Sequence, residues 1–236
     1  MTQQYHSMDY ARPKAEALNA FMRGVYGWMC MGLGVTTVAA YWVASSQTMM
    51  QFILGNQIVF FGLIIAEFAL VITISAAIRK LSAGAASGLF LLYSALNGLT
   101  LSSIFMIYAQ ATIMSAFLVS AGMFGAMSIY GLVTKKDLTS WGSFLFMGLI
   151  GIIIASVVNI FVKSSAMSSV ISYIGVLVFV GLTAYDTQKL KIMGETAPMG
   201  DGTAVRRGTI LGALTLYLDF INLFLMMLRI FGGSRD

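Results

Sequence analysis

The chain has 236 residues, of which 58% are hydrophobic and only 10% carry a charge. An average soluble domain carries a charge on about a quarter of its residues, so a soluble fold of this size is excluded. The net charge of +5 does not by itself indicate a nucleic-acid partner. Basic residues also collect on the cytoplasmic segments of membrane proteins, and we expect no nucleic acid to bind.

Seven windows of the sequence are apolar enough to cross a membrane, for which a helix needs about 20 mainly apolar residues. They predict an all-α integral membrane protein, a bundle of seven transmembrane helices. The predicted spans are 22–45, 57–78, 86–108, 111–133, 140–162, 167–187 and 209–231. We expect a cytosolic N-terminal tail, 1–21, one membrane domain, 22–233, and a polar loop at 188–208. No soluble catalytic domain fits, so function must lie in the bundle or its short loops.

The basic residues predict how the bundle is oriented, because Lys and Arg favour the cytoplasmic side. An N-terminus in the cytosol and a C-terminus outside put eleven of them on cytosolic segments and three outside. The cytosolic group is Arg12, Lys14, Arg23, Arg79, Lys80, Lys135, Lys136, Lys189, Lys191, Arg206 and Arg207, and the outer group is Lys163, Arg229 and Arg235. Contact with membrane lipid headgroups is a second role for the paired basic residues.

Three acidic residues fall inside the predicted spans: Glu67 in the second, Asp186 in the sixth and Asp219 in the seventh. An ionisable group at the centre of a bilayer costs about 2.5–3.5 kcal/mol on insertion scales, so those that remain usually face the bundle interior and mark a pathway or relay. Alternatively, Asp186 is an interfacial carboxylate that pairs with Lys189, and Glu67 has a hydrogen-bonded structural role.

The seventh span has the clearest internal pattern. Steps of four and three residues place seven side chains on one stripe, with apolar residues on the flanking faces. The stripe consists of Gly208, Gly212, Thr215, Asp219, Asn222, Met226 and Arg229. A purely structural interpretation is a close helix contact at the glycines with Asn222 bonding between helices. A carboxylate is a costly residue for that purpose, so the stripe predicts a polar pathway.

The sixth span supplies the natural partner for this stripe. Its residues Gly175, Phe179, Leu182 or Thr183, and Asp186 fall on one face, and consecutive spans run antiparallel. The depths of Asp186 and Asp219 match only approximately, and a seventh helix that begins later than residue 209, or a water-filled inner vestibule, would bring them together. We expect Glu67, Thr183, Thr215 and Asn222 to line the same pathway.

Several functional classes are disfavoured. Intramembrane aspartyl proteases have a Gly-x-Gly-Asp site, whereas this chain has Leu216-Tyr217-Leu218-Asp219, and its two prolines, Pro13 and Pro198, exclude their Pro-Ala-Leu element. A single histidine, His6, and a single cysteine, Cys30, supply no zinc site. We therefore expect no enzyme and no cofactor. A hard cation is the exception, because carboxylate, hydroxyl and carbonyl oxygens are its ligands.

Three segments resemble the Bax inhibitor-1 family, also called the transmembrane Bax inhibitor motif family, in its bacterial branch. They are Gly98-Leu-Thr-Leu-Ser-Ser-Ile-Phe105, Phe179-Val-Gly-Leu-Thr-Ala-Tyr-Asp-Thr-Gln188 and Ala213-Leu-Thr-Leu-Tyr-Leu-Asp-Phe-Ile-Asn-Leu-Phe224. The resemblance implies a bacterial inner-membrane protein whose seventh helix is central. It also implies a pH-sensitive calcium leak.

The resemblance further assigns roles to residues. Asp186 and Asp219 match the paired aspartates of the family and become the pH sensor and a possible Ca²⁺ ligand pair, and Arg79 is the candidate latch that holds the pair closed. The leading hypothesis is thus a pH-sensitive cation leak, with Ca²⁺ and protons as partners. The alternative is a non-conducting regulator that binds other membrane proteins, such as a membrane protease. The two carboxylates should share a proton and titrate in two coupled steps.

Overall fold

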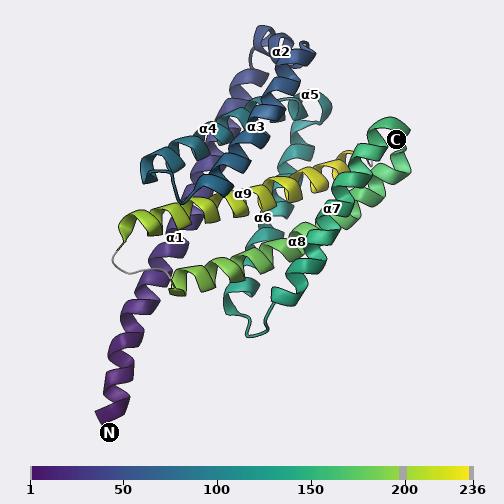
Figure 1. Cartoon of the computed structure of the whole chain (residues 1–236). Coiled ribbons are helices and arrows are strands. Elements are labelled where there is room, and N and C mark those ends of the chain that lie inside the picture. Colours follow the sequence, from purple (N-terminus) through teal and green to yellow (C-terminus); the bar gives the residue numbers. More distant parts are fainter. Residues whose placement is uncertain (1, 197–200, 234–236) are drawn as a thin grey trace. The chain divides into compact units, whose positions relative to one another are not determined.

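The computed structural model describes residues 2–196 and 201–233, with side chains from residue 15 onwards. Helices are the only regular secondary structure within these ranges (Figure 1). They are α1 Thr2–Ala44, α2 Gln47–Leu54, α3 Gln57–Ala77, α4 Ala83–Leu101, α5 Ile104–Ile107, α6 Gln110–Val133, α7 Thr139–Val162, α8 Ser165–Thr196 and α9 Gly202–Gly232. The side chains of His6, Arg12 and Lys14, together with Pro198 and Arg235, lie outside the described residues.

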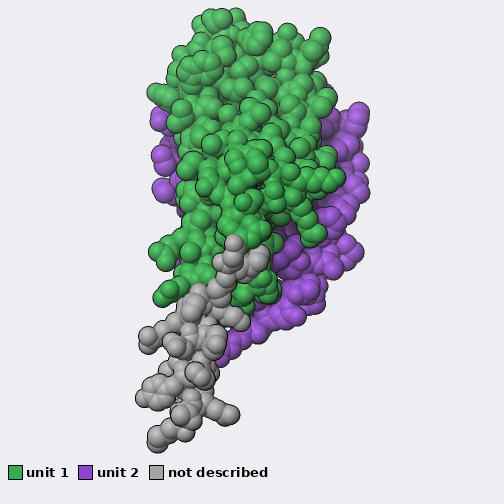
Figure 2. All heavy atoms as spheres, turned by 60° about the vertical axis from the view of Figure 1, so that its left-hand side comes forward, with its two compact units in different colours: residues 1–106, 190–217 green, residues 107–189, 218–236 purple. Residues whose placement is uncertain are grey.

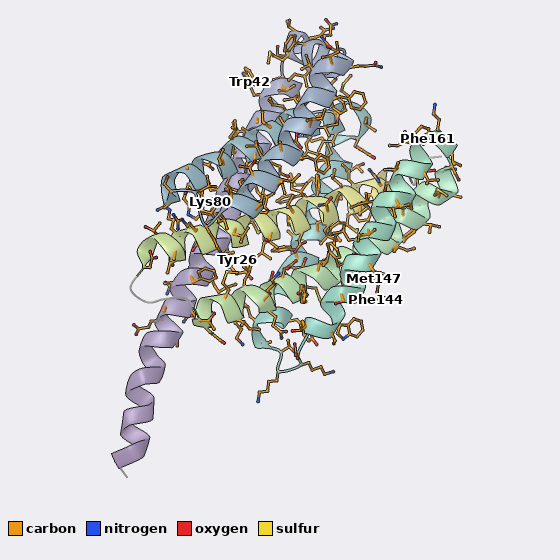
Figure 3. All side chains as sticks on the ribbon, in the orientation of Figure 1. Tyr26, Trp42, Lys80, Phe144, Met147 and Phe161 are labelled. Atoms are coloured by element: carbon orange, nitrogen blue, oxygen red, sulfur yellow. The ribbon has the colours of Figure 1, made fainter. Side chains whose placement is uncertain are left out.

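Seven helical segments in the described chain are long and apolar enough to span a membrane, which confirms the predicted fold class. Each one contains most of a predicted span. Their outer faces are apolar: Phe144, Met147 and Phe161 of α7 are 63%, 64% and 81% exposed and project away from the helix (Figure 3). In a membrane such faces contact lipid chains.

The third span is interrupted where two serines follow α4. The Ser102 hydroxyl donates to the Leu99 carbonyl at 2.6 Å, and the Ser103 hydroxyl donates to the Thr100 carbonyl at 3.0 Å. Serine side chains that bond the preceding turn compete with the helical hydrogen-bond ladder. The span therefore ends as the short helix α5.

The predicted bounds of the polar loop, 188–208, are wrong. Helix α8 continues to Thr196, and α9 begins at Gly202, where the Asp201 carboxylate accepts hydrogen bonds from the Thr203 and Ala204 amides at 3.0 and 2.9 Å. Hydropathy marks where the hydrocarbon ends, whereas a helix continues into the polar zone until a capping residue stops it. Helix α1 likewise runs through residue 21, the expected boundary between tail and membrane domain.

The chain divides into two compact units (Figure 2). The first holds residues 1–106 and 190–217, and the second holds residues 107–189 and 218–236. Helix α9 contributes to both, with its division after Tyr217. It is also the most buried of the seven spans, since 72% of its apolar window is buried against 6% in α3. This agrees with the expectation that the seventh helix is central.

Candidate functional site

Small residues fix the rotation of α8 within the second unit. A side chain at Gly131 of α6 would collide with the Ala184 carbonyl, and a Cβ at Gly142 of α7 would lie 2.5 Å from the Tyr185 ring. Two consecutive residues of α8 are thus packed closely against α6 and α7. The next residue, Asp186, lies on the side of α8 that meets α9, because each helical residue turns by about 100°.

Asp186 and Asp219 are brought together, as the sequence predicted. Their carboxyl groups are close enough to interact directly with each other. Asp219 is only 5% exposed, and its Oδ2 is buried without a hydrogen-bond partner among the described residues. Asp186 is partly buried and also interacts electrostatically with Lys189. A bond between two carboxyl groups requires a proton on one of them.

The predicted faces of the sixth and seventh spans meet over more than this one pair. Two turns or more from the aspartates, a Cβ at Gly175 of α8 would lie 2.8 Å from the sulfur of Met226 in α9. The expected later start of the seventh helix is wrong, because α9 begins at Gly202, before the predicted residue 209. Helix α8 in turn extends beyond Asp186 to Thr196. Asp186 therefore lies well inside its helix, not at its end.

Gly208 and Gly212 of the α9 stripe make the close helix contact that the purely structural interpretation predicted. This contact lies within the first unit. A Cβ at Gly212 would lie 2.7 Å from Leu190 and 3.1 Å from Val25, and one at Gly208 would lie 3.4 Å from Phe21. The stripe therefore combines two features. Its glycine half supports packing, and its polar half carries Asp219.

Three of the predicted pathway residues bond the backbone of their own helix. Thr183 donates to the Phe179 carbonyl at 2.8 Å, Thr215 to Leu211 at 3.0 Å and the Asn222 amide to Leu218 at 2.8 Å. These bonds occupy donors and leave side-chain oxygens as acceptors. Thr183 and Asn222 belong to the same unit as the aspartates, whereas Thr215 belongs to the first unit.

Glu67 lies in the first unit and is the centre of a separate polar network. Its Oε2 accepts from the Asn97 amide at 3.1 Å, and its Oε1 accepts from the Thr100 hydroxyl at 2.9 Å. The side-chain oxygen Oδ1 of Asn97 accepts from the Tyr217 hydroxyl at 3.0 Å, and the hydroxyls of Tyr217 and Thr36 lie 2.6 Å apart. The network thus joins α1, α3, α4 and α9.

Sequence analysis had not assigned a role to Thr36, Asn97, Thr100 or Tyr217. Thr100 and Tyr217 lie inside the family-like segments, and Asn97 immediately precedes one, which is the signal that could have found them. Their contact depends on the packing of α1 on α4, where a Cβ at Gly98 would lie 2.5 Å from the Thr36 carbonyl oxygen. That packing is not readable from helical periodicity.

Arg79, the candidate latch, is exposed just after the end of α3 and belongs to the first unit. Its pairing with the aspartates stays a prediction. The described residues contain no group of three or more His, Cys, Asp or Glu side chains that could hold a metal ion. Two carboxylates alone fall short of the six to eight oxygen ligands that Ca²⁺ takes.

The comparisons with known proteins agree with the motifs. The sequence profile described as "Inhibitor of apoptosis-promoting Bax1" matches residues 18–236. The chain belongs to the Bax inhibitor-1 family. Within this family it is 58% identical over 229 residues to "Inner membrane protein YbhL" of Escherichia coli K12, with 97% of each chain covered. It is 47% identical over 232 residues to an uncharacterized Borreliella burgdorferi protein, covering 97% of this chain and 99% of that one.

Family membership and seven candidate spans together make this Bax inhibitor-1 protein a multi-pass membrane protein. Its E. coli relative is named as an inner membrane protein. The predicted family is thus confirmed.

Proposed function

We propose that the protein is a pH-sensitive cation leak, with Ca²⁺ as the principal ion, gated by Asp186 and Asp219. The observation that carries the proposal is the direct interaction of these two carboxyl groups, of which Asp219 is only 5% exposed and has a buried Oδ2 without a hydrogen-bond partner among the described residues. Buried ionisable groups inside a span usually mark an ion or proton route. The resemblance to the Bax inhibitor-1 family, which implies a pH-sensitive calcium leak, also supports the proposal.

The proposed switch follows from the chemistry of the pair. While one proton is shared, the carboxyl groups bond to each other and hold α8 against α9. When that proton leaves, two negative charges face each other, repel and attract cations. The acceptor oxygens of Thr183 and Asn222 lie in the same unit and would contact the passing ion. A change in pH thereby shifts the population between two packings of the helix pair.

Calcium flux into liposomes that contain a trapped calcium dye tests the proposal against its rival, a non-conducting regulator that binds other membrane proteins. We expect flux through the wild-type protein and its loss in Asp186→Asn/Asp219→Asn. Asp137→Asn is the matched control, since Asp137 is a fully exposed carboxylate outside the spans. A folded wild-type protein that passes no calcium at any pH would favour the regulator.

The proposed orientation has an N-terminus in the cytosol of a bacterial cell and a C-terminus outside. In a Cys30→Ser background, single cysteines at Ser46 and Ser165 should react with impermeant thiol reagents added outside intact cells. A cysteine at Gly202 should not react until the membrane is opened. The reverse labelling pattern would refute the orientation while leaving the helix count intact.

A further inference from the structure

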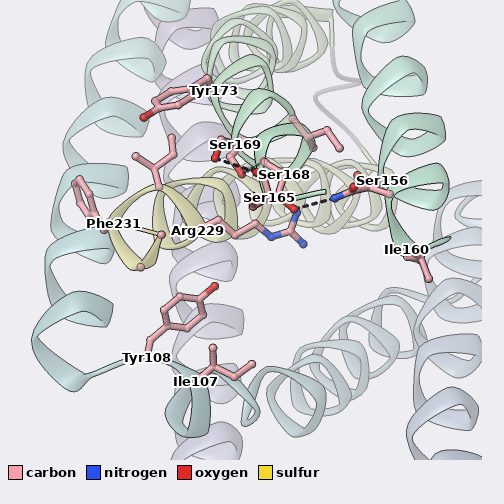
Figure 4. A pocket seen from close by; sticks show the side chains of 16 residues that line it. Ile107, Tyr108, Ser156, Ile160, Ser165, Ser168, Ser169, Tyr173, Arg229 and Phe231 are labelled. Atoms are coloured by element: carbon pink, nitrogen blue, oxygen red, sulfur yellow. Dashed lines mark hydrogen bonds between the residues drawn. The ribbon is translucent and has the colours of Figure 1, made fainter. Parts of the chain in front are cut away.

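The second unit contains a cavity of about 1080 Å³, and neither Asp186 nor Asp219 is among its lining residues. It lies where α7 ends, α8 begins and α9 ends, and Ile107 and Tyr108 close another side. All of its lining residues belong to this one unit. Figure 4 shows the Arg229 side chain extending into the cavity near Ser165 and Ser168, with Tyr108 facing it.

The described lining of this cavity carries positive charge only. Among the described residues, which end at Gly233, Arg229 is the only charged residue of its lining, and no carboxylate of that part of the chain lines it. The structure gives the Arg229 guanidinium no hydrogen bond or ion pair within the described residues, although five N–H groups are available on it. A guanidinium fork without a carboxylate partner is suited to bidentate binding of a phosphate or carboxylate group.

The cavity also offers several hydroxyl groups. Ser169 and Ser172 donate to backbone carbonyls at 3.2 and 2.9 Å, and the Ser168 oxygen accepts from the Asn159 amide at 2.8 Å. The hydroxyl hydrogen of Ser168 therefore stays available, as do those of Ser156 and Ser165, which have no partner within the described chain. The first turn of α8, which begins at Ser165, adds its positive dipole end to Arg229.

The residues at the rim of the cavity indicate which kind of molecule would carry the bound anion. Ile107 and Ile160 line the cavity and yet are 69% and 67% exposed, and Phe161 beside them is 81% exposed. In a membrane-spanning bundle such exposed apolar side chains face lipid chains. A polar cavity with a single cation thus opens next to a lipid-facing surface. This combination fits a phospholipid, with headgroup phosphate inside and acyl chains along the rim.

We propose that this cavity binds the headgroup of an anionic phospholipid through Arg229 and the serine hydroxyls. A phosphatidylcholine headgroup carries the same phosphate but also a quaternary ammonium, for which the lining described up to Gly233 offers no carboxylate. Phosphatidylglycerol should therefore bind better than phosphatidylcholine. The proposal is independent of the calcium leak, since it concerns binding alone.

The proposal is tested by measuring lipid binding to the full-length protein in detergent. Two measurements report it: the rise in unfolding temperature that the lipid causes, and the lipid retained in native mass spectrometry. We expect phosphatidylglycerol to stabilise the wild type more than phosphatidylcholine of equal chain length, and inorganic phosphate to have little effect. Arg229→Gln should weaken phosphatidylglycerol binding about tenfold or more, because a charge-assisted hydrogen-bond pair is lost.

The matched control is Lys163→Asn, which removes an exposed cation from the turn before α8 and outside the cavity lining. Asn tolerates the left-handed backbone of this position, where φ is 53°. Equal losses in both variants would overturn the proposal, because general surface charge would then explain binding. Stabilisation by inorganic phosphate equal to that by the lipid would overturn the lipid assignment.

A second variant keeps the test valid if Arg229→Gln folds poorly. Ser165→Ala/Ser168→Ala retains the cation and removes two hydroxyl groups, and it should weaken phosphatidylglycerol binding about tenfold, since two hydrogen bonds to the headgroup are lost. Unchanged lipid affinity in this variant would mean that the cavity does not hold the headgroup.

Discussion

Glu67 and Asp219 are both acidic residues inside apolar helices, but their hydrogen-bond partners differ in kind. The Glu67 carboxylate has a donor on each oxygen, the Asn97 amide at 3.1 Å and the Thr100 hydroxyl at 2.9 Å. Asp219 faces another carboxyl group, that of Asp186, and its Oδ2 has no partner among the described residues. The donors of Glu67 carry their own hydrogens at any pH, whereas the aspartates depend on one added proton.

On the proposed function, this difference would make Glu67 a structural acid and the aspartate pair a switch. Removal of the proton from the aspartate pair replaces a hydrogen bond by repulsion between like charges. The same change in pH leaves the donors of Asn97 and Thr100 in place. We therefore expect the second unit to respond to pH and the network of the first unit to serve stability.

The largest effect is expected from the aspartates. Asp186→Asn and Asp219→Asn should each remove most of the pH dependence of calcium flux, and the double variant should be little worse than either single one, because groups that share a proton are not additive. Flux profiles in liposomes over a series of pH values measure this. If both single variants kept the wild-type profile, the aspartates would be no more switchable than Glu67.

Arg79→Ala should raise calcium flux several-fold, provided that the guanidinium latches the pair. The increase should be greater at high pH, because a latch of this kind attracts only ionised carboxylates. Lys80→Ala is the matched control, since Lys80 is the neighbouring exposed cation. Equal flux in wild type and Arg79→Ala, at normal expression, would leave Arg79 as a residue that only sets orientation.

Glu67→Ala should lower the free energy of unfolding by about 1–3 kcal/mol, since it leaves the buried Asn97 amide without its acceptor. The Thr100 hydroxyl keeps the Asn97 backbone carbonyl as an acceptor at 3.0 Å. The position of the flux profile on the pH axis should not move. Unfolding in mixed micelles measures the change in stability, and calcium flux into liposomes measures the pH profile. Glu195→Ala is the control, since Glu195 is an exposed carboxylate of α8. A displaced or abolished pH profile would place Glu67 in the pathway, as the sequence analysis suggested.

The smallest effect is expected at Asp137, in the turn between α6 and α7. Hydrogen bonds from the Thr139 side chain and backbone amide hold the pKa of Asp137 below its ordinary value. A depressed pKa in the folded state adds stability above the unfolded value that is lost as pH falls through the folded one. Asp137→Asn should therefore lower the free energy of unfolding only above about pH 4. Its flux profile should match the wild type, and a shifted profile would contradict the assignment of the sensor to the spans.

The sequence predicted those parts of the molecule that depend on the period of one helix. Steps of three and four residues placed Asp219 and Met226 on one stripe of α9, and Gly175 and Asp186 on one face of α8, and these residues do meet. Adjacent, antiparallel spans made that pairing predictable. No such rule brings α1 beside α4.

The Glu67 network was missed for this reason. Thr36, Asn97 and Tyr217 come from helices distant in sequence, and their contact depends on close backbone approach at residues such as Gly98. The ends of α8 and α9 were missed for another reason. Charged residues after Gln188 mark the edge of the hydrocarbon, but nothing in their side chains stops a helix.

The division of α9 after Tyr217 has a mechanical consequence. Tyr217 is hydrogen-bonded within the first unit, and Asp219, two residues later on the same rigid helix, interacts with Asp186 within the second. A rotation of α9 large enough to separate Asp219 from Asp186 also displaces the Tyr217 hydroxyl from Asn97. The proposed release of the aspartates would therefore act on a helix whose Tyr217 is itself held by the Glu67 network.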